Sequence, residues 1–226
     1  AVLAGLSGAE RRRRRWQHWN HPLDDGHYPA VEARIPEADT VLSTTTFLQR
    51  KFGGHVIAMG VDTGKFKPQP PDAVRALRRE LGLEGRRLIV FGGVVRPHKG
   101  LEIIPEALRL IGDDSLRLLV VGPVTEHLEA LLRDPRLGPW IHVAGAPPDD
   151  PQGINAAIHK KMSLYLDLAD LVVLPLLDTP LAQSQMPIKV FEALAMAKPV
   201  VASRVADMPE MLHECGRVVP PGDAAA

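Results

Sequence analysis

The chain has 226 residues, 45% of them hydrophobic, and 27 basic residues balance 27 acidic ones. This length allows one complete core and a fraction of another, and the balanced charge gives no overall attraction to nucleic acid or to a strongly acidic partner. The single cysteine, Cys215, excludes an internal disulfide framework and indicates a reducing, cytoplasmic compartment. No apolar run approaches the roughly 18 residues that a membrane-spanning helix needs, and the first ten residues lack the pattern of a signal peptide.

Residues 1–62 predict only a remnant of an N-terminal domain. Short apolar segments at 38–43 and 55–59 are typical of strands, and a helix capped by threonines is expected between them, over 47–52. A segment rich in Pro, Gly and Lys follows and opens a hinge over 63–82. Because the chain begins without Met and stops soon after a predicted strand, we expect a fragment.

Residues 83–226 alternate between predicted strands and helices. Four strand segments are apolar along their length, as expected when helices cover both faces of a sheet: RLIVFG, LRLLVVG, LVVLPL and PVVAS, which begin at 87, 116, 171 and 199. Helical spacing separates them, with Pro105 expected to kink the helix over 101–111. The alternation predicts an α/β fold with a doubly wound parallel sheet.

The loop after residues 87–92 is the first candidate site, because open parallel sheets bind ligands beyond the carboxyl ends of their strands. Gly92 and Gly93 allow a tight turn and the close approach of a ligand. Arg96 and Lys99 then precede a predicted helix, whose unpaired N–H groups attract phosphate. The segment therefore predicts a diphosphate site, and a glycine turn with solvated basic residues is the alternative.

A second candidate leads into a helix predicted to start at Pro187, since proline is favoured at the first helical position. Free N–H groups near Met186, Ile188 and Lys189 are expected to hold phosphate oxygens. Glu192 lies one turn further and can accept hydrogen bonds from a ribose diol. The alternative is an exposed Glu192 that pairs with Lys189 on the helix surface.

A third, shorter loop follows the strand predicted at 141–144. Gly145, Ala146 and Pro147 give a turn against which a nucleotide base can lie. A plain turn is the alternative.

Four stretches together resemble the group 1 (GT4-like) retaining glycosyltransferases of the GT-B fold, which consists of two Rossmann-like domains. The resemblance covers residues 38–223 and is most specific in its last stretch. The stretches are HVIAMGVDTGKFKP (55–68), FGGVVRPHKGLEIIPEAL (91–108), ADLVVLPL (169–176) and MPIKVFEALAMAKPVVASRVADMPEML (186–212) with its sequel GRVVPPGD (216–223).

The resemblance implies a role for each matching residue. Arg96 and Lys99 match the pair that contacts the donor diphosphate, and Glu192 matches the second acid of a paired motif, which binds the ribose hydroxyls. The backbone of 186–188 matches the loop that faces donor sugar and phosphate, and Gly93 matches a close-approach position. Residues 83–226 are thereby assigned to a nucleotide-sugar-binding domain that is incomplete at its C-terminus.

One position departs from the family pattern. The first acid of the motif stands eight residues before the second, and Ser184 is found there. A hydroxyl cannot supply the charge that usually contacts the donor sugar, so either another residue such as Asp178 or Gln185 makes this contact or activity is altered.

The reaction implied is transfer of a glycosyl group from a nucleotide-diphosphate sugar with retention at the anomeric carbon. Cations and a helix start would stabilise the leaving group, and neither a cofactor nor a metal is expected. The adjacent acids Asp24-Asp25, Asp113-Asp114 and Asp149-Asp150 suit solvent better than a chelate. The implied acceptor is a saccharide, a lipid-linked molecule or a small molecule.

The N-terminal residues carry a basic and aromatic cluster, Arg11 to Arg15 with Trp16 and Trp19. It predicts either peripheral contact with an anionic membrane or a solvated basic helix end, and no nucleic-acid-binding module surrounds it. His18, His21 and His27 do not have the spacing of a zinc site.

Two other functions remain open on the same fold. One is a non-catalytic or degenerate nucleotide-binding fragment, which Ser184 and the short N-terminal part favour. The other is a sugar-nucleotide epimerase or a phosphorylase, for which Lys189 and Lys198 are the candidate pyridoxal-binding lysines. A nicotinamide-dependent dehydrogenase is disfavoured because the loop after 87–92 lacks the G-x-G-x-x-G spacing.

Overall fold

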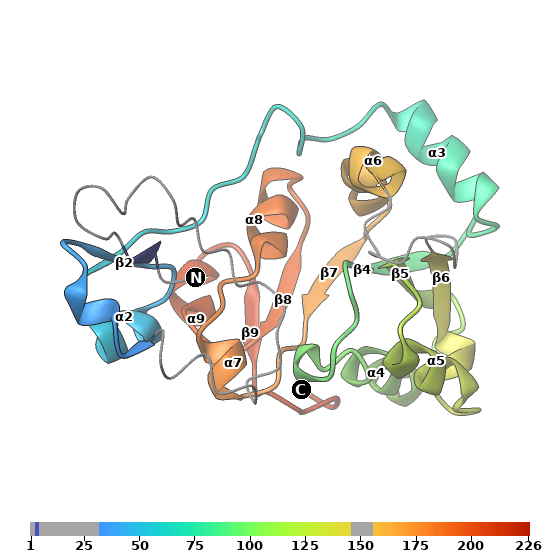
Figure 1. Ribbon diagram of the computed structural model, residues 1–226. Helices are drawn as coiled ribbons and strands as arrows, with labels where there is room; N and C mark the ends of the chain where they lie inside the picture. Colours follow the sequence, from blue (N-terminus) through green and yellow to red (C-terminus); the bar gives the residue numbers. More distant parts are fainter. Residues whose placement is uncertain (1–2, 5–31, 146–155) are drawn as a thin grey trace.

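The structure is a computed structural model that describes residues 3–4, 32–145 and 156–226. Its main feature is a six-stranded parallel sheet with the order β6-β5-β4-β7-β8-β9 (Figure 1). The strands are β4 (Arg87–Gly92), β5 (Leu116–Gly122), β6 (Ile141–Gly145), β7 (Leu171–Leu174), β8 (Val200–Ser203) and β9 (Arg217–Val219). The predicted α/β fold with a doubly wound parallel sheet is therefore confirmed.

The central strands are apolar throughout because both faces of the sheet are covered. In β4, Leu88 and Val90 pack into one core, whereas Ile89 and Phe91 pack into the other. Helices on the first face are α3 (Pro71–Glu80), α6 (Ala156–Asp167), α8 (Ile188–Ala195) and α9 (Met208–Met211), and those on the second face are α4 (Ile103–Ile111) and α5 (Glu126–Arg133) (Figure 1). Each fully buried aliphatic side chain contributes about 1.5–3 kcal/mol, so the two cores fix the sheet from both sides.

The chain changes direction at the centre of this sheet. From β4 it proceeds outward through β5 to β6, and it then returns to β7, on the other side of β4, and proceeds through β8 to β9. The loops that leave the carboxyl ends of β4 and β7 diverge here, and this is the point at which open α/β sheets bind ligands.

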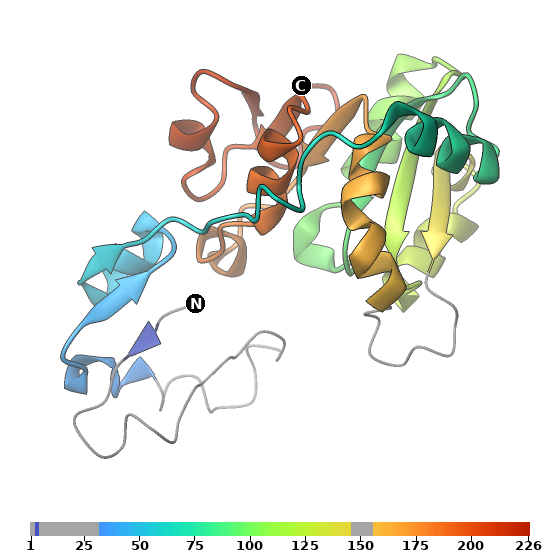
Figure 2. The ribbon, with the colours of Figure 1, turned by 90° about the horizontal axis from the view of Figure 1, so that it is seen from above.

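A smaller, three-stranded sheet lies to one side of the main domain (Figure 2). Its strands are β1 (Leu3–Ala4), β2 (Val41–Ser43) and β3 (His55–Val56), with α2 (Thr46–Phe52) between the last two. Thr45 caps α2 by accepting a hydrogen bond from the Leu48 N–H, and Gly53 follows its last turn. Both β2 and β3 are shorter than the sequence predicts.

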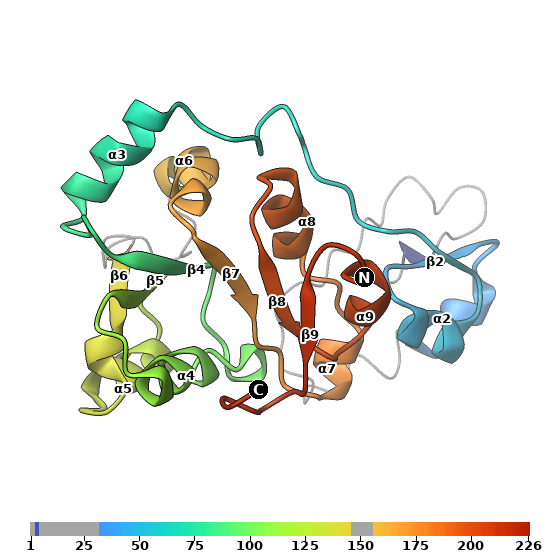
Figure 3. The ribbon, with the colours of Figure 1, turned by 180° about the vertical axis from the view of Figure 1, so that it is seen from behind.

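The start of α9 lies beside the start of α2 and contacts it (Figure 3). The Asp207 carboxylate, just before α9, accepts hydrogen bonds from the backbone N–H of Thr46, at 2.9 Å, and from its hydroxyl. Residues 57–70 form an extended connection from the small sheet to α3 (Figure 2). Helix α3 falls within the segment assigned to the hinge.

Two prolines take positions that differ from the predicted ones. Pro105 is the third residue of α4, where no intrahelical N–H bond is lost, so the reason for the expected kink is absent. Pro187 is the N-cap of α8, and Ile188, not Pro187, is the first helical residue.

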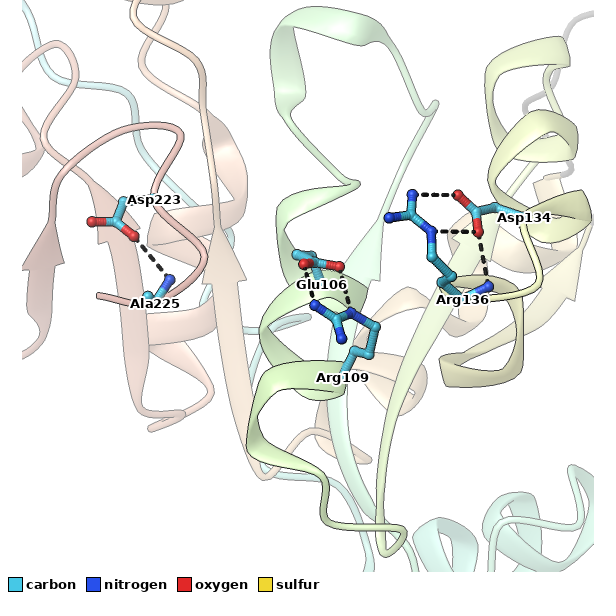
Figure 4. A network of polar contacts seen from close by, with 6 residues as sticks. All are labelled: Glu106, Arg109, Asp134, Arg136, Asp223 and Ala225. Carbon is cyan, nitrogen blue, oxygen red and sulfur yellow. Dashed lines mark hydrogen bonds and ion pairs between the residues drawn. The ribbon is translucent and has the colours of Figure 1, made fainter.

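Exposed ion pairs lie on the helices and loops of the second face (Figure 4). Arg109 binds Glu106 within α4, and Arg136 binds Asp134 after α5. Pairs of this kind contribute little to stability because water screens them. Within the described part of the chain, no helix is long and apolar enough to cross a membrane.

Candidate functional site

The candidate site lies where β4 ends, and its base is made of main chain. Gly93 has a φ of 124°, which disfavours other residues, and its N–H donates to the Val121 carbonyl oxygen at 2.8 Å. At the end of β5, a Cβ on Gly122 would collide with the Gly93 carbonyl oxygen. The loop therefore lies directly against the neighbouring strand, and Gly122 is a site residue that the sequence analysis missed. The sequence feature that could have revealed it is the glycine at the end of LRLLVVG, which matches the glycines at the end of RLIVFGG.

Lys99 bends back over this glycine loop. Its Nζ donates to the Val94 carbonyl oxygen at 2.8 Å, lies 3.9 Å from where a Cβ on Gly93 would stand, and is 5.7 Å from the centre of the Phe91 ring. Burial, with the charges of Arg96 and Lys189, lowers the pKa of Lys99 to about 8. Its ammonium is thus held at the loop among other cations, an arrangement that favours the arrival of an anion.

The segment after Arg96 differs from its prediction. Pro97–Lys99 form a single 3-10 turn that Gly100 ends with a φ of 60°, and α4 begins only at Ile103. Lys99 is therefore not adjacent to the start of a long helix. Arg96 lies close enough to lower the pKa values of both Lys99 and His98, and burial is the largest cause in each case.

The loops after β4 and β7 are bonded to each other. The Leu177 N–H donates to the His98 carbonyl oxygen at 3.1 Å, and the Gly100 Cα has no room for a side chain because the Pro175 carbonyl oxygen is next to it. This contact fixes the distance between the glycine loop and the segment that leads to α8.

The first turn of α8 reaches the end of β4. The Lys189 Nζ binds Glu192 Oε2 at 2.7 Å, and Lys189 Cε lies 3.7 Å from where a Cβ on Gly92 would stand. Glu192 is only 5% exposed, so the pair exists but the interpretation as an exposed surface pair is wrong. At the start of α8 the Val190 N–H already donates to the Pro187 carbonyl oxygen at 3.1 Å, so Ile188 and Lys189 supply the N–H groups that a helix start leaves for a ligand.

The other predicted residues of this segment take separate places. The Met186 side chain is buried in the core, so only its backbone can face a ligand, whereas Ile188 is 38% exposed. The Ser184 hydroxyl donates to the Leu181 carbonyl oxygen at 2.8 Å and is thereby engaged with α7 (Pro180–Gln183). Asp178 accepts a hydrogen bond from Gln183 Nε2 at 2.7 Å.

Gly145 ends β6 and pairs with Gly122 at the same edge of the sheet. It therefore lies beside β5 and not beside the lysines. Ala146 and Pro147 lie outside the described residues, as does the whole segment 5–31 with its arginine, tryptophan and histidine cluster.

The structure thus brings together groups that the sequence separates by about a hundred residues. Gly92, Gly93 and Lys99 from the loop after β4 meet Lys189 and, through it, Glu192 from α8. Among the described residues, no group of three or more side chains could hold a metal ion.

A cleft of about 270 Å³ separates the small sheet from α8 and α9. It is mostly apolar, with two carboxylates. Its lining residues are Thr44, Val56, Ala58, Met186, Phe191, Asp207, Glu210 and Met211.

The sheet order and the glycine loop at its reversal define a Rossmann-like α/β domain. The chain belongs to the family "Glycosyl transferases group 1", whose sequence model matches residues 85–226.

Curated relatives agree with this family. The chain is 31% identical, over 67% of its length and 38% of the relative's, to the GDP-mannose-dependent alpha-(1-6)-phosphatidylinositol monomannoside mannosyltransferase of Mycolicibacterium smegmatis. It is 27% identical, over 92% of its length and 48% of the relative's, to the MMP alpha-(1->4)-mannosyltransferase of Mycolicibacterium hassiacum. The chain therefore spans less than half the length of these relatives.

Solved structures share the GT-B fold. HepE of Anabaena in complex with UDP and glucose superposes with a TM-score of 0.67 at 23% identity, over 88% of this chain and 54% of that one. Sucrose-phosphate synthase of Thermosynechococcus elongatus superposes with a TM-score of 0.67 at 25% identity, over 90% of this chain and 50% of that one.

Proposed function

We propose that this chain is the donor-binding part of a retaining glycosyltransferase that takes a glycosyl group from a nucleotide-diphosphate sugar. The observation that carries the proposal is the meeting of Lys99 and Lys189 over the Gly92-Gly93 loop, with the buried Glu192 beside them. Two ammonium groups above bare main chain suit a diphosphate, and a carboxylate one helical turn away suits the two hydroxyls of a ribose.

Each group has a task in this reaction. The diphosphate lies on the glycine loop, where Lys99, Arg96 and the first N–H groups of α8 offset the negative charge that grows on the leaving nucleotide. Glu192 accepts hydrogen bonds from the ribose, and the base lies toward Gly145. The sugar then projects from the loop at 186–188 toward the cleft beside the small sheet, from which the acceptor attacks.

The named ligands of relatives support this proposal. One relative is described as GDP-mannose-dependent, and HepE is described in complex with UDP-glucose. A saccharide or lipid-linked acceptor is proposed on the same basis, since the first of these relatives acts on a phosphatidylinositol monomannoside.

Thermal unfolding with UDP, GDP and ADP at millimolar concentration tests donor binding. At least one nucleotide should raise the melting temperature by several degrees, since a ligand at 100 times its Kd stabilises by about 2.7 kcal/mol. Glu192→Ala and Lys99→Ala should each remove more than half of this shift, whereas Arg133→Ala, at an exposed position on α5, should retain it. Absence of a shift with all three nucleotides would contradict the proposal.

A second function is favoured by one observation. Position 184 is a serine, which has no carboxylate to offer to the donor sugar, and its hydroxyl donates to the Leu181 carbonyl oxygen instead. A domain that binds the nucleotide without transferring the sugar would have this feature. Nucleotide binding without product formation, in a longer natural chain that contains both domains, would select this alternative.

A further inference from the structure

The pair between Lys189 and Glu192 has an unusual position. Glu192 is nearly buried, and an ionised carboxylate in such a place needs a compensating charge. Lys189 supplies that charge through a 2.7 Å contact with Oε2. Without Lys189, the Glu192 carboxylate would lose the partner that holds it in place and would turn toward water, where it would be a poorer acceptor of two hydroxyl hydrogen bonds.

Lys189 also belongs to the cationic group at the glycine loop. Its Cε lies beside Gly92, and its charge is one of the causes that lower the pKa of Lys99. One side chain therefore contacts the carboxylate on α8 and approaches the loop on which the phosphates are proposed to lie.

We propose that Lys189 is a positioning residue that holds the Glu192 carboxylate oriented toward the ribose diol, so that recognition of the ribose depends on a side chain at the diphosphate loop. This inference rests on the proposed function and extends it, because it gives the Lys189 side chain a task in recognition of the ribose besides its place at the diphosphate loop.

The proposal predicts a specific change in ligand preference. An intact Glu192 should favour a nucleoside diphosphate over its 2′,3′-dideoxy analogue, which has no ribose hydroxyls. Loss of Lys189 should reduce this preference, because the affinity for the complete nucleotide falls more than the affinity for the analogue. If Lys189 only attracted phosphate, its loss would instead lower the affinities for both ligands by the same factor.

Isothermal titration of the 226-residue chain with UDP, GDP and ADP, and with the dideoxy analogue of the tightest of them, measures this preference. We expect at least about a tenfold preference in the natural chain, because Glu192 would accept one to two charge-assisted hydrogen bonds from the ribose, and less than about threefold in Lys189→Met. Lys189→Arg should restore most of the preference. An unchanged preference in Lys189→Met overturns the inference and leaves nucleotide binding intact, whereas absence of binding in the natural chain overturns the proposed function and the inference with it.

Lys198→Met is the matched control. Lys198 forms a similar, partly buried pair with Asp167, at 2.7 Å, but this pair lies near the amino ends of β7 and β8. It should lower the melting temperature and leave the dideoxy preference as it is in the natural chain. If Lys189→Met does not fold, Lys189→Gln takes its place, since its amide can still donate one hydrogen bond to Glu192. Its dideoxy preference should lie between that of Lys189→Arg and that of Glu192→Gln, in which the carboxylate itself is lost. A preference equal to that of the natural chain would again overturn the inference.

Discussion

Two partly buried lysine–carboxylate pairs lie at opposite ends of the strands of the main sheet and have different surroundings. Lys189 and Glu192 lie beyond the carboxyl end of β4, whereas Lys198 and Asp167 lie near the amino ends of β7 and β8. Both pairs join at 2.7 Å. Their chemistry is the same, so any difference in what they do must come from their neighbours.

The neighbours of the second pair are protein groups that bond to both of its members. Asp167 also accepts a hydrogen bond from the Gln69 N–H at 2.6 Å, and Lys198 donates to the Asp167 carbonyl oxygen at 2.8 Å. This pair ties the extended connection at residue 69 to α6. The first pair instead has Lys99 nearby, and like charges there leave an excess of positive charge. A balanced pair stabilises the fold, and an unbalanced one is prepared for an anion.

The largest expected effect comes from removing the balanced pair. Asp167→Ala leaves the partly buried Lys198 ammonium and the Gln69 N–H without the carboxylate that accepts from them, so we expect the free energy of unfolding to fall by about 3 kcal/mol. Urea denaturation measures this loss. The affinity of the folded protein for a nucleoside diphosphate should change less than twofold, and a change above fivefold would show that the two edges are coupled.

A pH titration should separate the two pairs next. The pKa of Lys99 is lowered from 10.5 to about 8 in the folded chain, and a bound anion would raise it. Nucleotide affinity should therefore fall by about tenfold between pH 7 and pH 9. Lys99→Met should remove this dependence, and a natural chain whose affinity is constant over this range would contradict the placement of Lys99 at the phosphates.

The same titration has the opposite sign for stability without ligand. Between pH 8 and 10.5 the unfolded chain holds the Lys99 proton more tightly than the folded chain does. The unfolded state then binds more protons, so the contribution of Lys99 to the free energy of unfolding rises with pH in this window. The difference between the natural chain and Lys99→Met in urea denaturation at pH 7 and pH 10 isolates this contribution.

Salt concentration should have a smaller effect, and it should change nucleotide affinity more than the free energy of unfolding. Raising NaCl from 50 to 500 mM should weaken nucleotide binding by about fivefold, because the cations around Lys99 must attract an anion from solvent. The free energy of unfolding should change by less than about 1 kcal/mol, since ions screen buried pairs poorly. Titration calorimetry and urea denaturation at both salt concentrations provide the comparison, and a salt-independent Kd would argue against a diphosphate site.

The smallest effect is expected at an exposed pair on α4. Glu106→Gln removes the partner of Arg109 on a solvated helix surface (Figure 4). The melting temperature should change by less than about 1 °C in calorimetry. A larger decrease would mean that burial is not what separates strong pairs from weak ones in this protein.

The sequence predicts the sheet well because the strand signal is local. RLIVFG and LRLLVVG become β4 and β5 at the expected residues. Two faces covered by helices require continuous apolar runs, and such runs are visible without knowledge of their neighbours. The small sheet is predicted less well, since strands of two or three residues leave little pattern to detect.

The candidate site shows the limit of such reasoning. Spacing places Lys189 and Glu192 on one face of a helix, but it does not reveal that Lys189 lies beside the end of β4 or that Glu192 is buried. The 3-10 turn at Pro97–Lys99 is hidden for a similar reason, because proline suits the first position of either kind of helix and Gly100 ends the turn only through its left-handed conformation. Long-range packing decided both features.

The contact between Gly122 and the Gly93 carbonyl oxygen restricts how this site can be re-engineered. Even a methyl group on residue 122 would displace the loop, and the φ of Gly93 disfavours a side chain at that position too. Mutant libraries aimed at a new sugar or base therefore have no useful diversity to sample at these two codons. Changes in preference must be sought around the rim of the pocket, at positions such as 178, 184 and 188, while the glycines are kept constant.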